Sequence, residues 1–160
     1  MPKKGDYVCT LDAVDLATFW VEPIAPKGRG QHAVLDALKA IRGRLPFAVL
    51  SVDSDNDSAF INALMQGYCQ QEGIAFGRSR PYRKNDQAHI EQRNWSIVRQ
   101  LIGYDRYEGD ATAAFNALWE KRRLYVNFFQ PVCKLLKKER IDGKVRKEYD
   151  EARTPYHRLM

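Results

Sequence analysis

The sequence predicts an α/β domain in which helices pack against a mixed sheet. Two short stretches near the start are predicted to form a pair of strands joined by a short turn: 7–15, in which apolar residues alternate with others, and 19–24. A continuous apolar run at 47–53 is typical of a buried parallel strand. Helical patterns lie between and after these strands. The predicted order is therefore strand, strand, helix, strand, helix, strand, helix, helix.

Four helices are expected where apolar residues recur every three or four positions. The first covers roughly 31–43, and the second ends at Gly73, before a short edge strand at 74–77. The third includes Ile97. The fourth, at 114–129, has the clearest amphipathic pattern in the chain.

Composition limits the protein classes that fit. A chain of 160 residues with 44% hydrophobic residues suits one globular domain. The sequence shows no apolar run near the roughly 20 residues that span a bilayer and no signal-peptide pattern, so we expect no membrane partner. Three cysteines, Cys9, Cys69 and Cys133, suit neither a disulfide framework nor a zinc site. Reduced core thiols and a cytoplasmic location are expected.

The net charge of +6 is unevenly distributed. Residues 121–160 contain 12 Lys and Arg against 5 Asp and Glu, whereas residues 1–120 are almost neutral. We therefore divide the chain into a core, 1–130, and a basic C-terminal extension, 131–160, expected to be extended and weakly packed. The basic charge predicts a polyanionic partner. A solvated tail without a partner is the alternative.

Two carboxylates stand in settings suited to metal chemistry. Asp55 directly follows the apolar run, and Glu91, 35 residues further on, lies early in the third predicted helix. A carboxylate at a strand end and one on a helix can converge on a Mg²⁺ ion used for phosphoryl transfer. Alternatively, Asp55 caps a helix and Glu91 is a solvated helix-face residue.

The surrounding residues resemble a known family. The stretch 54–62, Ser-Asp-Asn-Asp-Ser-Ala-Phe-Ile-Asn, resembles the Ser-Asp-Asn-Gly-Ser-Glu-Phe segment of the integrase core in bacterial insertion-sequence transposases. Pro-Tyr at 81–82 and the stretch 85–95 are similar to the segment with that family's final Glu. Ala-Thr-Phe-Trp-Val-Glu at 17–22 is similar to its Ala-Thr-Gly-Trp-Thr-Glu strand pair. The resemblance covers nearly the whole chain, and retroviral integrases are more distant relatives.

The resemblance implies a ribonuclease-H-like fold and a DDE-type transposase that cleaves and joins DNA strands in transposition. It implies two Mg²⁺ (or Mn²⁺) ions, with Asp55 as the second carboxylate and Glu91 as the third. It also implies DNA as partner, a homo-oligomer that brings two DNA ends together, and a bacterial, nucleoid-associated location.

The chain departs from the family pattern in three places. The first catalytic Asp and the central strand that carries it have no counterpart, so we expect the chain alone to be inactive. Asp12, on the neighbouring strand, is the candidate surrogate for that carboxylate. Asp57 and Ala59 stand where the family has Gly and Glu. A non-catalytic remnant that binds DNA non-specifically through basic segments is the alternative function.

Basic residues around Glu91 are candidates for contacts with DNA phosphates. They form a loop before Glu91 and continue on the helix that carries it. The alternative is a charged loop without a DNA contact. The candidates are Arg78, Arg80, Arg83, Lys84, Arg93 and Arg99.

Overall fold

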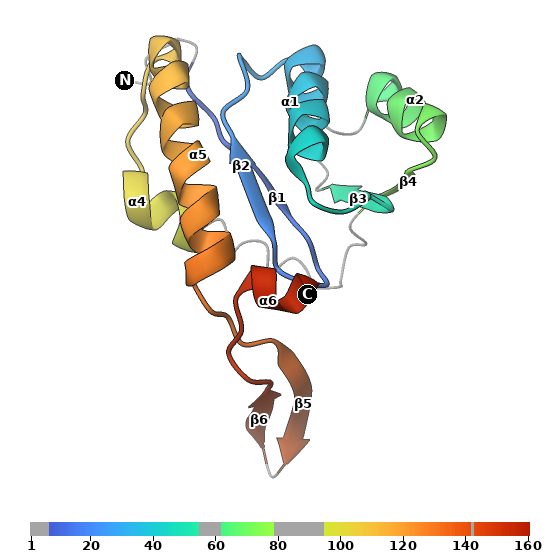
Figure 1. The fold of residues 1–160 in the computed structure, drawn as a ribbon, viewed down its shortest axis with the longest axis vertical. Helices are drawn as coiled ribbons and strands as arrows, with labels where there is room; N and C mark the ends of the chain where they lie inside the picture. Colours follow the sequence, from blue (N-terminus) through green and yellow to red (C-terminus); the bar gives the residue numbers. More distant parts are fainter. Residues whose placement is uncertain (1–6, 55–61, 79–94, 142) are drawn as a thin grey trace.

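The computed structural model describes residues 7–54, 62–78, 95–141 and 143–160 (Figure 1). Helices pack against two of the three small sheets, and the third sheet, the C-terminal hairpin, projects from the body of the molecule. The elements are β1 (Leu11–Val14), β2 (Val21–Ile24), α1 (Gln31–Arg44), β3 (Ser51–Ser54), α2 (Ala63–Gln71), β4 (Ala75–Arg78), η1 (Trp95–Arg99), α4 (Gln100–Ile102), η2 (Gly109–Ala111), α5 (Thr112–Phe129), β5 (Leu135–Ile141), β6 (Lys144–Tyr149) and α6 (Pro155–Leu159).

The predicted order of strands and helices is confirmed up to α5, with shorter strands than the apolar runs indicated. In the 47–53 run only β3 forms regular strand, and Leu50, just before it, is 80% exposed. The extension at 131–160, expected to be extended and weakly packed, contains regular structure. It forms the β5–β6 hairpin and the helix α6, in which Pro155 is buried.

The three cysteines are free thiols, as predicted. Only Cys69 lies in the core, where burial raises the pKa of its thiol. Cys133 is exposed, so the expectation of a core position is wrong for this residue. It precedes the projecting hairpin, where little of the chain packs against it.

Each sheet has two strands. β1 and β2 pair antiparallel, with Leu11 opposite Ile24, and β3 and β4 pair parallel, with Ser51 opposite Ala75. β5 and β6 form the antiparallel hairpin. Among the described residues no strand joins the β1–β2 pair to the β3–β4 pair.

The outer edge of β2 is closed by side chains of α5 and α1. The carboxamide of Asn127 accepts a hydrogen bond from Val21 N and donates one to Val21 O, both at 2.9 Å. Asn116 does the same for Ala25, at 2.8 and 2.9 Å. Between them, Pro23 has no N–H to satisfy. Side chains therefore replace a neighbouring strand along this edge.

β1 has one edge that does not face β2, and β3 has one edge that does not face β4. Both of these edges carry backbone groups that point away from the partner strand. Asp15 N donates to Trp20 O, so the alternation directs the backbone groups of Asp12 and Val14 to the other side of β1. Ala75 N donates to Leu50 O, so Ser51 and Asp53 likewise turn away from β4. In Figure 1, β1 lies between β2 and the β3–β4 pair. This arrangement agrees with the prediction of a sheet that lacks its central strand.

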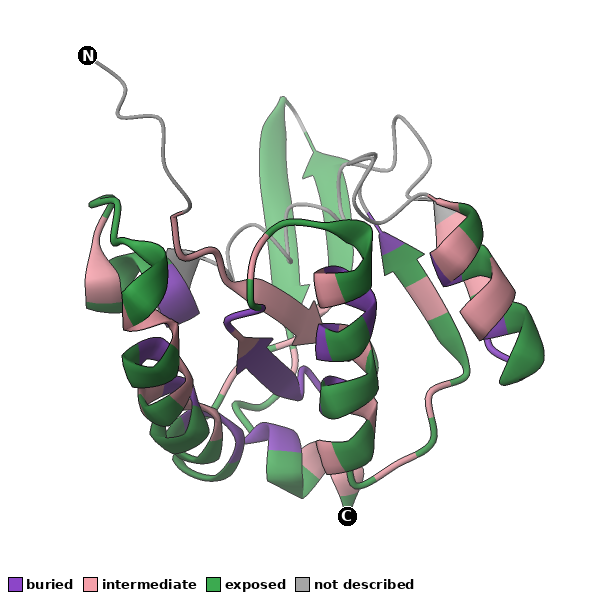
Figure 2. Ribbon diagram, turned by 90° about the horizontal axis from the view of Figure 1, so that it is seen from above, coloured by how far each residue is buried: buried purple, intermediate pink, exposed green. Residues whose placement is uncertain are grey.

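The apolar core is divided into two clusters, and Figure 2 shows the buried residues on the ribbon. One cluster lies between β2, η1 and α5 and is built around Val21, Ile97 and Trp119. The other lies between α1, α2 and the β3–β4 pair and includes Leu35 and Met65. The helix α1 contributes to the second cluster and also contacts β1 and β2, so it connects the two halves.

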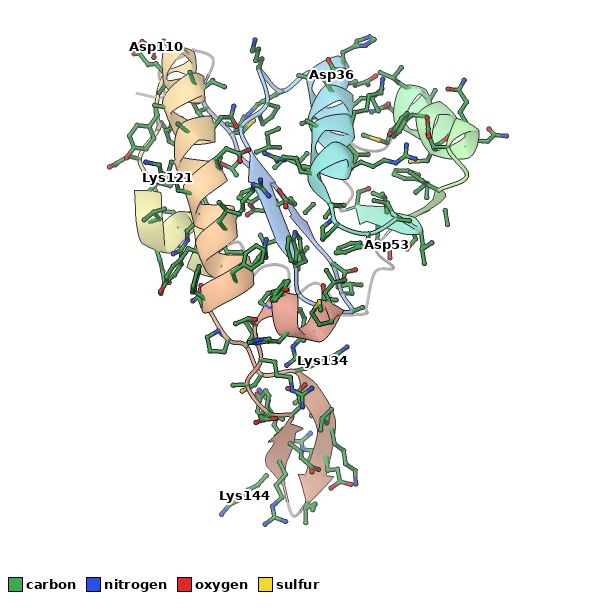
Figure 3. The ribbon with its side chains drawn as sticks, viewed as in Figure 1. Asp36, Asp53, Asp110, Lys121, Lys134 and Lys144 are labelled. Atoms are coloured by element: carbon green, nitrogen blue, oxygen red, sulfur yellow. The ribbon has the colours of Figure 1, made fainter. Side chains whose placement is uncertain are left out.

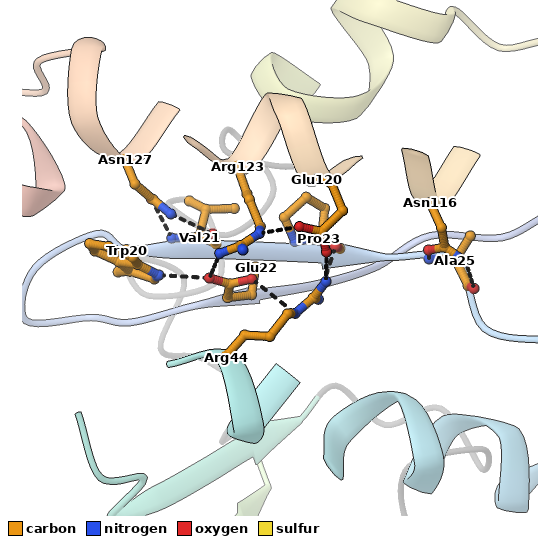
Figure 4. Close-up of polar contacts among 10 residues, drawn as sticks. All are labelled: Trp20, Val21, Glu22, Pro23, Ala25, Arg44, Asn116, Glu120, Arg123 and Asn127. Carbon is orange, nitrogen blue, oxygen red and sulfur yellow. Dashed lines mark hydrogen bonds and ion pairs between the residues drawn. The ribbon is translucent and has the colours of Figure 1, made fainter. Parts of the chain in front are cut away.

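A buried ion network fixes α1 and α5 to β2 (Figure 4). The Glu22 carboxylate is fully buried, accepts a hydrogen bond from Trp20 Nε1 at 2.9 Å, and accepts another from Arg123 Nη1 at 3.1 Å. Its second oxygen lies 3.4 Å from Arg44 Nε. Both arginines also pair with Glu120, at 2.6 and 3.0 Å. One carboxylate from β2 therefore holds cations from two helices.

Glu22→Gln should destabilise the fold by about 3 kcal/mol, because it leaves two partly buried guanidinium groups without a buried counter-charge. The matched control is Glu120→Gln, in the same network but with a side chain 48% exposed; its cost should be about 1 kcal/mol or less. Urea denaturation measures both. Equal losses would contradict the central role of Glu22.

Phe19 occupies a left-handed backbone conformation, with φ 62°, in the turn between β1 and β2. The Asp15 carboxylate closes this turn by accepting hydrogen bonds from Thr18 N and Oγ1, at 2.8 and 2.6 Å. The resembling transposase segment has Gly here, for which such a φ is unstrained. The Phe19 ring is 6% exposed and lies 6.0 Å from the charged ends of both Lys134 and Arg158. The strained residue therefore contacts the base of the C-terminal hairpin.

Phe19→Ala and Phe19→Gly should both destabilise the fold, since each deletes a buried ring. The Gly variant should be the more stable of the two by about 1 kcal/mol, because Gly adopts positive φ without strain. Thermal unfolding of the pair measures this difference. An Ala variant as stable as the Gly variant would show that the backbone at residue 19 is not strained.

Candidate functional site

The candidate site lies at the carboxyl edge of the β3–β4 pair. Ser54, the last residue of β3, is opposite Arg78, the last residue of β4. In the sequence Asp55 follows Ser54 directly, and the segment 79–90 that leads to Glu91 follows Arg78. Because β3 and β4 are parallel, both segments leave the sheet at the same edge, where open α/β sheets bind ligands. Asp55 and Glu91 themselves lie outside the described residues.

Most of the predicted DNA-contacting residues also lie outside the described ranges: Arg80, Arg83, Lys84 and Arg93. Arg78 is placed by its backbone as the end of β4. Arg99 is exposed at the end of η1, with its guanidinium carbon 5.0 Å from the centre of the Tyr104 ring. Its Nη1 also donates to Gly103 O at 3.4 Å. Arg99 therefore fixes the loop after α4, while the side chain stays open to solvent.

Asp53 and Gly77 form a contact at this edge that the sequence did not reveal. Asp53 is exposed and lies opposite Gly77 in the β3–β4 register (Figure 3). A Cβ atom at residue 77 would collide with the Asp53 carboxylate. Gly77 therefore leaves room for a carboxylate above the end of the sheet. A glycine inside a strand pattern is the signal that could have indicated such a close approach.

Asp12, the candidate surrogate carboxylate, is a half-buried residue of β1 whose carboxyl group is buried. Neither of its carboxyl oxygens is accessible to solvent or has a hydrogen-bond partner among the described residues. Strand alternation places its side chain on the same face as that of Val14, which packs against the cluster around Trp119. Burial raises the pKa of this carboxyl from 3.8 to about 7.

This carboxyl differs from Glu22, the other buried acid of the sheet, which contacts two guanidinium groups. A buried carboxyl without a counter-charge can hold a proton near neutral pH or accept a cation. Within the described ranges, His, Cys, Asp and Glu side chains form no group of three that could hold a metal ion. A metal site at this edge therefore depends on residues beyond those ranges.

Comparison with known sequences identifies one informative relative. The chain is 46% identical over 147 residues to the uncharacterized protein y4rM of Sinorhizobium fredii (strain NBRC 101917 / NGR234). The match covers 91% of this chain and 42% of that protein, so the chain spans less than half of its relative's length. No family model matches the sequence.

Comparison with solved structures shows the fold. The chain superimposes on the catalytic core domain of BIV integrase with a TM-score of 0.59 over 77% of each chain, at 18% sequence identity. The predicted ribonuclease-H-like α/β fold, with helices flanking small sheets, is confirmed by this likeness. None of the helices in the described part of the chain combines the length and apolar character that a membrane crossing requires.

Asp12→Asn should stabilise the protein at high pH, because the native state must ionise a buried carboxyl whose pKa is about 7 instead of 3.8. In the parent protein, the proton on Asp12 contributes its full stability below about pH 4, and this contribution is lost as the pH rises to 7. The gain over the parent should therefore grow across this interval and level off above it, reaching at most about 4 kcal/mol for a pKa that burial raises from 3.8 to about 7.

Urea denaturation between pH 4 and 9 measures this gain. Asp36→Asn, on the exposed side of α1, is a control that removes the same charge from the surface. A difference between Asp12→Asn and the parent that stays constant with pH would contradict the buried, uncompensated state of Asp12.

Proposed function

We propose that this chain is the catalytic-core portion of a DDE-type enzyme that cleaves and joins DNA strands, as in transposition. The observation that carries the proposal is the placement of Ser54 opposite Arg78 at one edge of a ribonuclease-H-like fold. The two motif segments that resemble the transposase core leave the sheet there. The likeness to BIV integrase supports the fold, and the motif residues support the chemistry.

The donor set fits a hard divalent cation. Asp55 and Glu91 offer carboxylate oxygens, which Mg²⁺ and Mn²⁺ prefer, and Asp53 adds negative charge at the same edge. When bound, two such ions supply an activated hydroxyl nucleophile and stabilise the departing 3′-oxygen. Asp55 would hold both ions, and Glu91 would hold one.

The first carboxylate is the open position of this site. Asp12 is the candidate on this chain because it is buried on the edge strand of the sheet and has no counter-charge among the described residues. If Asp12 does not serve, the chain alone is inactive, and activity requires a further strand that supplies the carboxylate. The edges of β1 and β3 that have no strand partner in the described part of the chain could receive that strand.

DNA is the proposed partner, and a homo-oligomer is the proposed active form, because joining two DNA ends needs two active sites. Lys and Arg before and after Glu91 would contact the phosphates near the metal site. A nucleoid-associated, cytoplasmic location follows from the same proposal. The alternative function is non-specific DNA binding by a non-catalytic core, favoured by the lack of a motif residue for the first carboxylate.

Asp55→Asn or Glu91→Gln should each weaken Mn²⁺ binding at this edge by about 10-fold or more, since loss of even an outer-shell group costs that much. Paramagnetic broadening of the amide signals of Val52, Ser54 and Gly77 during a Mn²⁺ titration reports the binding. Asp53→Asn removes the same charge next to the site but no proposed ligand, and should retain most of the broadening.

Equal behaviour of all three variants would contradict the metal site and favour the non-catalytic alternative. Strand-transfer activity of the chain, abolished by Asp12→Asn but not by Asp36→Asn, would assign Asp12 as the first carboxylate. An inactive chain with an intact Mn²⁺ site would show that the first carboxylate comes from another segment.

A further inference from the structure

The β5–β6 hairpin projects from the body of the molecule, with Lys144 near its far end (Figure 3). Every residue of β6, and every residue of β5 after Leu135, is exposed. Val145 and Tyr149 are 52% and 50% exposed. Such a ribbon has almost no packing of its own, so its side chains are available to a partner.

The register sorts the side chains of the hairpin onto two different faces, because opposite residues of paired strands share a face. The first, which we name the cationic face, pairs Lys138 with Lys147 and Arg140 with Val145, and Tyr149 lies on it by alternation. The second, the mixed face, carries cations interleaved with carboxylates. Its members are Lys137, Glu139, Ile141, Lys144, Arg146 and Glu148.

The two faces differ in how their charges are compensated. On the mixed face, Glu139 lies opposite Arg146 and forms an ion pair with Lys137 at 2.5 Å. On the cationic face, Lys138 lies directly opposite Lys147, an arrangement that destabilises an antiparallel pair. No carboxylate among the described hairpin residues shares that face. An external polyanion would remove the repulsion.

The hairpin is held firmly at its base, so its direction is set by the core. The Arg158 guanidinium binds both Asp150 oxygens, at 2.6 and 3.0 Å, and donates to Val132 O at 2.8 Å. These hydrogen bonds lower the pKa of Asp150 to about 2. The ring of Tyr156 on α6 lies 4.9 Å from that of Phe128 on α5. A ribbon anchored in this way loses little conformational freedom on binding.

We propose that the β5–β6 hairpin is a DNA-docking ribbon whose cationic face lies against duplex DNA, in or along the major groove. The inference rests on the proposed function and adds a second DNA contact, remote in sequence from the Asp55 and Glu91 site. Three cations without a carboxylate complement the phosphates. A two-stranded ribbon fits the major groove of B-form DNA, whereas the major groove of duplex RNA is too narrow.

Two triple variants of the full chain test the proposal, and each removes three positive charges. The first, Lys138→Gln with Arg140→Gln and Lys147→Gln, empties the cationic face. The second, Lys137→Gln with Lys144→Gln and Arg146→Gln, removes the cations of the mixed face. Fluorescence anisotropy with a duplex DNA of about 25 base pairs, at several salt concentrations, measures affinity and salt dependence.

The cationic-face variant should bind about 10- to 100-fold more weakly near 0.1 M salt, and its log–log salt slope should be shallower by about 2 to 3. The mixed-face variant should lose less than about 3-fold, since Glu139 and Glu148 share that face and Lys137 already pairs with Glu139. Duplex RNA of the same length should bind more weakly than DNA to the parent chain. Thermal unfolding checks the fold: the cationic-face variant should melt no lower than the parent, because it loses a like-charge pair.

Equal losses for the two variants, or none for either, would overturn the docking face and leave the proposed metal chemistry untouched. Equal affinity for duplex RNA would overturn the major-groove assignment. If Asp55→Asn and Glu91→Gln weaken Mn²⁺ binding no more than Asp53→Asn does, the proposed catalytic function is overturned. The hairpin contact would still stand on its own binding data.

Discussion

The arrangement of this fold depends on the ion pairs that the buried Glu22 carboxylate forms with Arg44 and Arg123. In the described residues the β1–β2 and β3–β4 pairs share no backbone hydrogen bonds, so the sheet itself does not unite the two halves. Arg44, at the end of α1, and Arg123, on α5, meet on this one carboxylate. Because α1 also packs against α2 and the β3–β4 pair, the contact between Glu22 and Arg44 transmits the position of one half to the other. Asn116 and Asn127 complete the connection by satisfying the outer edge of β2.

The same arrangement explains where polar groups remain uncompensated. The β2 edge is closed by side chains, whereas the facing edges of β1 and β3 carry backbone groups without a strand partner among the described residues. Asp12 lies on one of these edges with a buried carboxyl and a raised pKa. Asp53 lies on the other, above Gly77. Carboxylates and unpaired strand edges therefore occur together in the part of the fold that leads to Asp55. Such a combination of carboxylates and open strand edges is expected of a functional region, because a purely structural core would neutralise or exclude these polar groups.

Several features could be predicted from the sequence because they rest on local periodicity. The helix α5 follows from its apolar stripe, the order of elements from alternating patterns, and the strand β3 from the apolar run at 47–53. Other features depend on long-range contacts. The burial of Asp12 is invisible in a sequence that places it beside Asp15 near a turn. The positive φ of Phe19 was predictable only through the Gly of the resembling segment. The β5–β6 hairpin was missed because its charges obscure the strand pattern, although alternation separates them onto two faces.

The central claim is that Asp55 and Glu91 converge on a divalent cation at the carboxyl edge of β3 and β4. A crystal structure of the chain grown with Mn²⁺, using anomalous scattering to locate the ion, tests this claim most directly. The account predicts an anomalous peak at this edge, about 2.1 Å from carboxylate oxygens of both residues. Side chains of Asp55 and Glu91 on opposite faces of the fold, or a peak at neither residue, would contradict it.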